Sequence, residues 1–222
     1  MAMTADGKIA TANRAVTSFG SAQDLEHLYE LRSTADAILC GARTVEQSHA
    51  TLGNGPDKFT RRRLRAGISP YPLRVVVSGS GSLSPTAELW GTASSPVIVL
   101  ASAKASETRL KRLRGLASEV WVSPGREVDF AAALQALHDD HGVRRLLCEG
   151  GSQVNDALFR AGLVDELHLT VCPLIFGGRT APTIADGIGF ERLADAAQLE
   201  LKTLKRIGDE LFLVYRSAGP KP

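Results

Sequence analysis

Short apolar runs alternate with amphipathic stretches along most of the chain, and this alternation limits the fold more than any other feature. Runs typical of buried strands occupy residues 36–41, 73–78, 96–101, 119–122, 144–149 and 165–175. Apolar residues recur at helical spacing over residues 22–34, 106–116, 129–141 and 153–161. Because strands and helices alternate, we predict an α/β fold whose mostly parallel sheet is covered on both faces.

The remaining segments have different patterns. Two strand-like runs, 199–207 and 210–215, flank the turn residues Gly208 and Asp209, which predicts a C-terminal antiparallel hairpin. Residues 49–72 are rich in Gly, Pro and Arg, and we expect a long surface loop with some helix there. We expect one domain over residues 1–222, because 222 residues suit a single large domain.

The composition is that of an ordinary globular protein, with 44% hydrophobic and 23% charged residues. A net charge of +2 gives no support for a nucleic-acid or membrane surface. The sequence has no apolar run of the roughly 20 residues that a membrane span needs, and it has no visible signal peptide. The three cysteines lie apart in strand-like runs, which favours buried reduced thiols. We therefore expect a cytoplasmic protein without nucleic-acid or membrane partners.

The stretch over residues 146–155 carries the strongest chemical signal. An apolar run ends on Glu149, Gly150 and Gly151, and an amphipathic helical pattern follows. Two glycines allow a sharp turn and close approach of a ligand, and a helix N-terminus favours an anion. Other polar or glycine groups, at 41–44, 78–80 and 177–178, also follow strand-like runs. Since open α/β sheets bind ligands at the carboxyl ends of their strands, this joint placement favours a ligand site.

Each of these groups also has a simpler interpretation when taken alone. The Gly pair could be an ordinary turn, Glu149 a solvated side chain and Thr44 a helix cap. Lys8 alone is more typical of a solvated surface, and so are the arginines at 61–65. The five histidines and three cysteines have no metal-ligand spacing, so we expect no metal. The sequence also lacks the Gly-x-Ser-x-Gly, Walker and Gly-x-Gly-x-x-Gly motifs.

Several segments, taken in order, resemble the reductase domain of riboflavin biosynthesis, which occurs as half of bifunctional deaminase-reductases and as stand-alone enzymes. They cover nearly the whole chain: 2–10 (AMTADGKIA), 31–45 (LRSTADAILCGARTV), 74–77 (RVVV), 149–151 (EGG), 162–166 (GLVDE), 173–178 (PLIFGG) with 181–182, and 187–190 (GIGF). The resemblance implies a three-layer fold similar to dihydrofolate reductase, NADPH as hydride donor, and a homodimer. It implies reduction of a ribosylamino-pyrimidine 5′-phosphate to the ribitylamino form.

The resemblance also implies roles for individual residues. Lys8 and Glu149 would be catalytic; Lys8 would steer the sugar or relay a proton, and Glu149 would bind its hydroxyls. Asp6 and Leu52 would join Glu149 in substrate binding. The cofactor would be bound by residues at several strand ends: Ala2, Gly41, Thr44, Ser78, Gly79, Gly150, Gly151, Ser152, Gln153, Val154 and Asn155. Within that set, Ser78 and Gly79 would meet the adenosine end.

The chain departs from the pattern of many relatives on the substrate side. Ser48 replaces an aspartate, Ser18 lies near a usual tryptophan, and residues 53–56 replace a segment that usually holds an arginine. The arginines at 61–65 are then the nearest candidates for the substrate phosphate. Two alternatives stay open: a reductase of the same fold acting on another heterocycle, and a non-catalytic nucleotide-binding relative. The zinc motifs of the deaminase half are absent, so we expect no deaminase activity.

Overall fold

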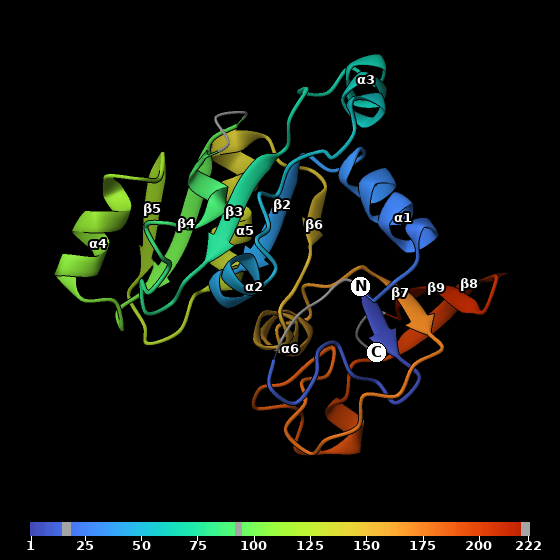
Figure 1. Cartoon of the computed structure of the whole chain (residues 1–222). Coiled ribbons are helices and arrows are strands. Elements are labelled where there is room, and N and C mark those ends of the chain that lie inside the picture. Colours follow the sequence, from blue (N-terminus) through green and yellow to red (C-terminus); the bar gives the residue numbers. More distant parts are fainter. Residues whose placement is uncertain (15–18, 92–94, 219–222) are drawn as a thin grey trace. The chain divides into compact units, whose positions relative to one another are not determined.

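The computed structural model describes residues 1–14, 19–91 and 95–218 and divides the chain into two compact units. Residues 28–149 form the central unit, and residues 1–27 with 150–222 form the terminal unit. Figure 1 draws the chain in sequence colours. The expected single domain over 1–222 remains a prediction, and Ser18 lies outside the described residues.

The central unit is built on a five-stranded parallel sheet with strand order β5-β4-β3-β2-β6. Its strands are β2 (Ala37–Gly41), β3 (Leu73–Val77), β4 (Val97–Ser102), β5 (Glu119–Ser123) and β6 (Leu146–Cys148). Its helices are α2 (Ala42–Gln47), α3 (Asp57–Arg65), the 3₁₀ turn η1 (Glu88–Gly91), α4 (Glu107–Arg114) and α5 (Phe130–His141). Every residue of β2 and β4 is buried.

The order of these strands puts helices on both faces of the sheet. From β2 to β5 the chain advances through neighbouring strands, and it then returns through α5 to β6 on the other side of β2. Because crossovers between parallel strands are right-handed, a crossover in the reverse direction lies on the opposite face. Figure 1 accordingly shows α5 behind the sheet and α2 in front of it. The predicted coverage of both faces is confirmed for this unit.

The terminal unit contains a four-stranded sheet with strand order β1-β7-β9-β8. β1 (Ala2–Thr4) and β7 (Glu166–Cys172) are parallel, whereas β7, β9 (Glu210–Ser217) and β8 (Leu199–Ile207) are antiparallel neighbours. The unit also holds α6 (Ser152–Arg160) and the 3₁₀ turn η2 (Leu193–Asp195), while α1 (Ala22–Arg32) crosses the boundary between the two units.

The predicted α/β class, the mostly parallel sheet and the C-terminal hairpin are confirmed, with the strands divided between two sheets. The strand predicted over 165–175 is the main overestimate, because β7 ends at Cys172. Pro173 follows directly, and it has no backbone N–H to continue a ladder. Leu174 is 40% exposed and Ile175 is 72% exposed, so their apolar character does not mark a buried strand.

Among the residues that the structure describes, no helix is long and apolar enough to cross a membrane.

His168 on β7 has a pKa below its usual value. Burial is the main cause, the nearby His27 adds to it, and Glu166 opposes it with a hydrogen bond. The His168 and His27 ring centroids lie 5.7 Å apart. In the folded protein the imidazole is therefore neutral at pH values where the unfolded chain, with a pKa near 6.5, already binds a proton.

We expect an acid-dependent loss of stability from this histidine. The contribution of neutral His168 to the free energy of unfolding is complete above pH 6.5. It is lost as the pH falls through the lower pKa that His168 has in the folded state. Urea unfolding at several pH values between about 7.5 and 5.5 tests this expectation, with His168→Phe as comparison. The variant, which keeps the other four histidines, should show a flatter dependence on pH. Parallel curves would contradict the assignment to His168.

Candidate active site

Three neighbouring strands of the central unit end side by side at the predicted ligand-binding edge. Gly41, the last residue of β2, pairs with Val77, the last residue of β3. Cys148 at the end of β6 pairs with Leu39, and the N–H of Glu149 donates to the Leu39 carbonyl over 2.9 Å. The structure thus brings the predicted groups at 41–44, 78–79 and 149 to one edge of this sheet.

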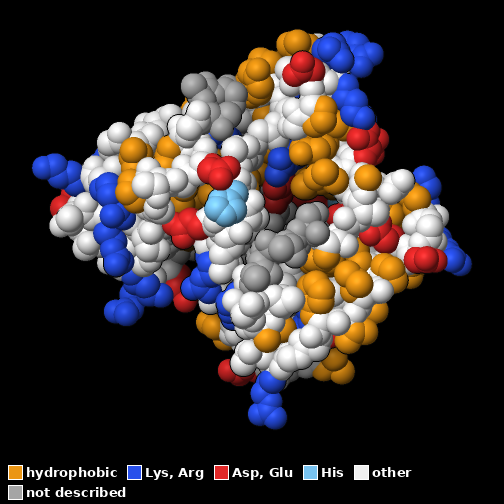
Figure 2. Space-filling view, viewed as in Figure 1, with side chains coloured by type: hydrophobic (Ala, Val, Ile, Leu, Met, Phe, Trp, Pro, Cys, Tyr) orange, Lys and Arg blue, Asp and Glu red, His pale blue; other side chains and the backbone are white. Residues whose placement is uncertain are grey.

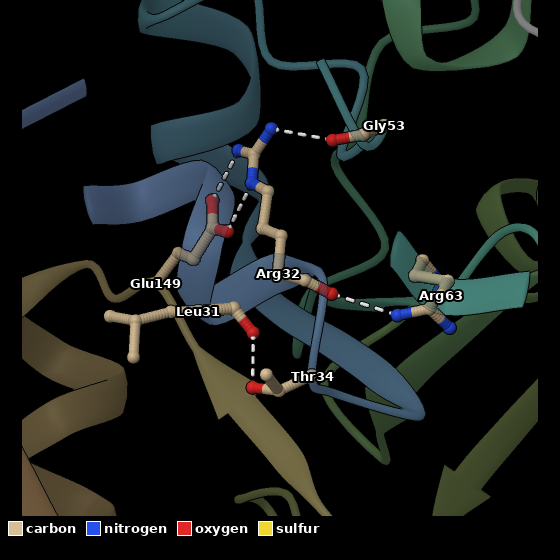
Figure 3. A network of polar contacts seen from close by, with 6 residues as sticks. All are labelled: Leu31, Arg32, Thr34, Gly53, Arg63 and Glu149. Carbon is tan, nitrogen blue, oxygen red and sulfur yellow. Dashed lines mark hydrogen bonds and ion pairs between the residues drawn. The ribbon is translucent and has the colours of Figure 1, made fainter. Parts of the chain in front are cut away.

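Glu149 is held by a guanidinium from α1. Arg32 Nε donates to Glu149 Oε1 and Arg32 Nη2 donates to Oε2, each over 2.6 Å (Figure 3). The two side chains are 11% and 12% exposed, so this two-point ion pair is largely shielded from water. Bidentate pairs of this kind fix the orientation of the carboxylate as well as its position. Glu149 is therefore neither a solvated side chain nor a freely rotating one.

The third nitrogen of the Arg32 guanidinium group anchors the pair to the loop after α2. Arg32 Nη1 donates to the Gly53 carbonyl over 2.7 Å. Burial lowers the pKa of Arg32, but the charge and hydrogen bonds of Glu149 together outweigh it, and its pKa is raised overall. Arg32 therefore remains a cation at every pH of interest, and it keeps a positive charge against the Glu149 carboxylate.

A second buried arginine supports the first from α3. The Arg63 side chain has no exposed surface. Its Nη1 donates to the carbonyl of Arg32 over 2.8 Å and to that of Ala35, and its Nε donates to the carbonyl of Ser69 over 2.8 Å. Figure 3 shows Arg63 pointing at the end of α1 that carries Arg32. Arg63 thus ties the last turn of α1 to α3.

This geometry corrects the interpretation of residues 61–65 as one solvated group of arginines. The segment is most of the helix α3, and Arg63 lies on its buried side with Phe59, four residues earlier. Because the Arg63 side chain has no exposed surface, and its Nε and Nη1 donate to backbone carbonyls, it is not a candidate for the substrate phosphate. The other three arginines are exposed, and the hypothesis for the phosphate is confined to them: Arg61, Arg62 and Arg65.

The other predicted residues of the central unit differ in exposure. Gly41 is the N-cap of α2, and Thr44 is half-buried in its first turn. The buried Ser78 accepts from the N–H of Leu83 over 3.2 Å. Gly79 accepts two hydrogen bonds from Ser102 at its carbonyl, and a Cβ at Gly79 would meet only the Ser102 hydroxyl, at 3.6 Å. The backbone at Gly79 is therefore open to a ligand.

Leu52 has a different environment from the others. Its side chain is fully buried in the core of the central unit, in a cluster with Ile38 and Val45. This environment accounts for an apolar residue there without a ligand. Substrate contact by Leu52 remains a prediction.

In the terminal unit, the predicted polar residues near the chain start have partners within the protein. Lys8 donates from Nζ to the Ala181 carbonyl over 3.2 Å, which uses one of three ammonium donors. Asp6 accepts from the Thr4 hydroxyl and from the backbone N–H groups of Phe176 and Gly177, so its pKa is lowered, mainly by Thr4. Asp6 thereby fixes the turn after β7 through hydrogen bonds.

Ala2 begins β1 and pairs with Thr170 of β7 in parallel register. Its side chain is half-buried. The structure places Ala2 in the terminal unit with Lys8 and Asp6. Its contact with the cofactor remains a prediction, as do the roles of the other residues named above.

The glycine-rich turn of the terminal unit leads directly into α6. Gly150 has φ +89°, a backbone conformation that requires glycine, and a Cβ there would also lie 2.6 Å from Cε at the flexible end of the Met1 side chain. Gly151 is the N-cap of α6, in extended conformation, and no side chain caps the helix there. The N–H of Val154 donates to the Gly151 carbonyl over 2.9 Å, so the N–H groups of Ser152 and Gln153 are those of this turn that remain for an external acceptor.

The first turn of α6 also holds the segment around residue 185. Asn155 Nδ2 donates to the Ile184 carbonyl over 2.7 Å, and the Ser152 carbonyl accepts from the N–H of Asp186 over 3.2 Å. Gln153 is exposed and Val154 is buried. Of the predicted cofactor residues on this helix, Ser152 and Asn155 therefore hold this segment by hydrogen bonds, whereas Gln153 is exposed to solvent.

The described ranges, 1–14, 19–91 and 95–218, contain no group of three or more His, Cys, Asp or Glu side chains that could hold a metal ion. The Cys40 and Cys172 thiols are buried as predicted, whereas the Cys148 thiol is half-buried.

The comparisons with known proteins agree on one family. The chain belongs to the RibD C-terminal domain family, whose model matches residues 1–213. A 2,5-diamino-6-ribosylamino-4(3H)-pyrimidinone 5′-phosphate reductase of Methanothermobacter thermautotrophicus is 38% identical over 218 residues, which cover 98% of this chain and 96% of the relative. The protein of the same name from Archaeoglobus fulgidus is 32% identical, covering 97% and 95%.

Solved structures show the same relationship. A pyrimidine reductase-like protein of Corynebacterium diphtheriae superimposes with a TM-score of 0.82 at 25% identity, covering 99% of this chain and 90% of that one. RibD of Acinetobacter baumannii has a TM-score of 0.74 at 20% identity and is covered over 56% of its length. The family predicted from the sequence is thus confirmed, and the fold is that of its reductases.

Proposed function

We propose that the protein catalyses the NADPH-dependent reduction of a ribosylamino-pyrimidine 5′-phosphate to its ribitylamino form in riboflavin biosynthesis. The observation that carries the proposal is the buried Arg32–Glu149 pair at the ligand-binding edge of a sheet in a member of this family. Since the most similar relatives cited above are named for the 2,5-diamino pyrimidinone, we propose that form as the substrate.

Glu149 is proposed to bind the hydroxyl groups of the ribose. Each carboxylate oxygen already accepts one hydrogen bond from Arg32 and has a further lone pair for a second. Because Arg32 fixes the plane of the carboxylate, the free lone pairs point in set directions, which favours one orientation of the sugar. Arg32 is thus a positioning residue for Glu149.

The cofactor is proposed to bind along the strand ends and the glycine turn. NADPH would supply the hydride that reduces the opened sugar. Residues that would hold it include the uncapped N-terminus of α6 at Gly151, for the pyrophosphate, and Ser78 with Gly79, for the adenosine end. The open backbone at Gly79 supports this assignment. Lys8 is proposed to steer the sugar or to relay the proton that completes the reduction.

A binding and turnover experiment tests the proposal. We expect NADPH fluorescence to report binding, and NADPH absorbance to fall when the 2,5-diamino substrate is added. The deaminated uracil analogue serves as the comparison substrate and should react more slowly. A protein that binds neither NADPH nor NADH would contradict the proposal. Nucleotide binding without turnover of either pyrimidine would instead favour another heterocyclic substrate.

A further inference from the structure

The helix α3 carries arginines in two kinds of environment. Figure 2 shows Lys and Arg side chains on the surface where Figure 1 draws α3. Arg63, on the same helix, has no exposed surface. Burial lowers the pKa of Arg63, and the charge of Asp36 opposes this effect. Because it is costly to remove a charge from water, the buried position of Arg63 requires an explanation in terms of what this side chain contacts.

The contacts of Arg63 fix the backbone of Arg32. Arg63 Nη1 donates to the Arg32 carbonyl over 2.8 Å (Figure 3) and also to the Ala35 carbonyl. The last carbonyls of a helix have no partner within the helix, and the guanidinium supplies donors at this end of α1. Arg63 Nε holds the Ser69 carbonyl over 2.8 Å. Arg63 thus fixes the point from which the Arg32 side chain extends toward Glu149.

A second buried polar side chain, Asn54, restrains the segment that receives the Arg32 guanidinium. Arg32 Nη1 donates to the Gly53 carbonyl over 2.7 Å. Asn54, the next residue, is buried, and its Nδ2 donates to Thr60 Oγ1 over 3.0 Å and to the Pro70 carbonyl. Because Gly53 and Asn54 share a peptide bond, these hydrogen bonds restrain the Gly53 carbonyl as well. The helix α3 and the segment after it therefore hold both ends of the Arg32 side chain.

The ring of Tyr29 also contacts the Arg32 guanidinium. The guanidinium carbon lies 5.7 Å from the centroid of the ring, within the range of a cation–π contact. The ring packs against Phe59 of α3, with the two centroids 5.5 Å apart. Gly55 has φ +75°, and a Cβ there would lie 2.2 Å from the Tyr29 ring. The loop after Gly53 is therefore packed closely against the ring that contacts Arg32.

Stability alone does not account for the two buried polar side chains. In the part of the chain that the structure describes, Arg63 Nη2 and Asn54 Oδ1 are buried without a hydrogen-bond partner. A buried polar atom of this kind costs about 1–3 kcal/mol. Apolar side chains would avoid the cost, and replacing buried charges by apolar residues is often neutral or stabilising. The arrangement is therefore better suited to fixing Arg32 than to stabilising the central unit.

We propose that Arg63 and Asn54 are positioning residues for the reaction, and that through Arg32 they fix the direction of the Glu149 carboxylate. The inference rests on the proposed function, in which Glu149 binds the hydroxyl groups of the sugar. A bidentate pair transmits position, because a turn of the guanidinium moves both carboxylate oxygens. Reaction rates depend steeply on such placement, and a displacement of about 1 Å can lower a rate about 100-fold.

Arg63→Lys tests the inference, with Arg74→Lys as the matched control. Lysine keeps the charge but lacks the planar fork that joins several carbonyls. Arg74 is also buried, and its donors also end on backbone carbonyls, those of Thr51, Leu89 and Ser95. We expect Arg63→Lys to lower turnover about 10- to 100-fold and to leave the dissociation constant of NADPH within about twofold. The control should lose comparable stability in thermal unfolding and keep its turnover.

The Nε–H signal of Arg32 in a proton–nitrogen NMR spectrum reports the ion pair directly. Arg32→Lys, which lacks this group, identifies the signal. In Arg63→Lys the signal should shift or broaden, because the 2.6 Å contact with Glu149 is loosened. In Arg74→Lys it should stay unchanged. A loss of stability alone, measured well below the unfolding temperature, would not move this signal.

Thr60→Val gives a second test from the other side of Arg32. Valine keeps the volume of the side chain but removes the acceptor for Asn54 Nδ2, so turnover should fall in the same direction and by less than in Arg63→Lys. Thr60 is half-buried, and this variant decides the question if Arg63→Lys does not fold.

Three results would overturn the inference while leaving the proposed function standing. They are equal losses of turnover in Arg63→Lys and Arg74→Lys, an unchanged Arg32 signal in Arg63→Lys, and normal turnover in Thr60→Val. An unaltered protein that turns over neither pyrimidine would instead refute the proposed function. The Arg32 signal would still decide whether Arg63 fixes the ion pair.

Discussion

Glu149→Gln is expected to lower turnover about 100-fold or more, with little change in NADPH affinity. Glutamine keeps the shape of the side chain and one acceptor oxygen, but it removes the charge and one of the two acceptors that Arg32 holds over 2.6 Å. The sugar then loses its fixed anchor, whereas the proposed cofactor contacts remain. Steady-state turnover and NADPH titration measure the two effects separately. Glu127→Gln, an exposed change in the same unit, is the control.

Glu149→Ala should differ from the glutamine variant in stability. Removing the whole carboxyl group leaves Arg32 buried and unpaired, which costs about 3–5 kcal/mol when a buried ion pair loses one partner. Urea unfolding measures this loss. If the glutamine variant turns over normally and only the alanine variant fails, Glu149 has a structural role alone, and the catalytic assignment is wrong.

Gly151→Val is expected to weaken NADPH binding about tenfold or more, which corresponds to about 1.4 kcal/mol or more. Gly151 has φ −67° and ψ −175°, so its φ does not itself require glycine. The added side chain would, however, stand at the N-terminus of α6, where we propose that the pyrophosphate approaches the backbone. NADPH titration and thermal unfolding of the variant measure affinity and folding.

The neighbouring glycine supplies the contrast. At Gly150, φ +89° is unfavourable for any residue that has a Cβ, so Gly150→Val should lower the stability of the fold itself, by about 1–3 kcal/mol of backbone strain. Normal NADPH affinity in Gly151→Val would refute the role of this turn in cofactor binding.

Most elements of the fold could be predicted because their patterns are local. The helical spacing that predicts residues 22–34 corresponds to α1 (Ala22–Arg32), and the apolar run at 36–41 corresponds to β2 (Ala37–Gly41). Gly208 and Asp209 lie between the two strands of the closing hairpin, as turn chemistry predicts. Each of these signals depends on residues that are neighbours in the sequence.

The buried arginines could not be predicted in the same way. Arg32 and Glu149 are 117 positions apart, and nothing local to either residue indicates the pairing. A weak signal exists, because Arg32 lies four residues after Leu28 and thus on the apolar stripe of its helix. Arg63 has a similar signal in Phe59, but its partners are backbone carbonyls, which leave no trace in the sequence. The prediction that Arg63 lies on the surface rested on its charge alone, and it is therefore wrong.

The environments of the cysteines determine which thiols can react. Burial raises the pKa of Cys172 to about 12, with a further contribution from Glu210, and burial with the Glu149 charge raises the pKa of Cys40 well above its usual value. At neutral pH both are almost wholly in the thiol form, and it is the thiolate that attacks oxidants and alkylating agents. Among the three cysteines, the half-buried Cys148 is therefore the most accessible to alkylating agents and oxidants, and it immediately precedes Glu149 in the chain.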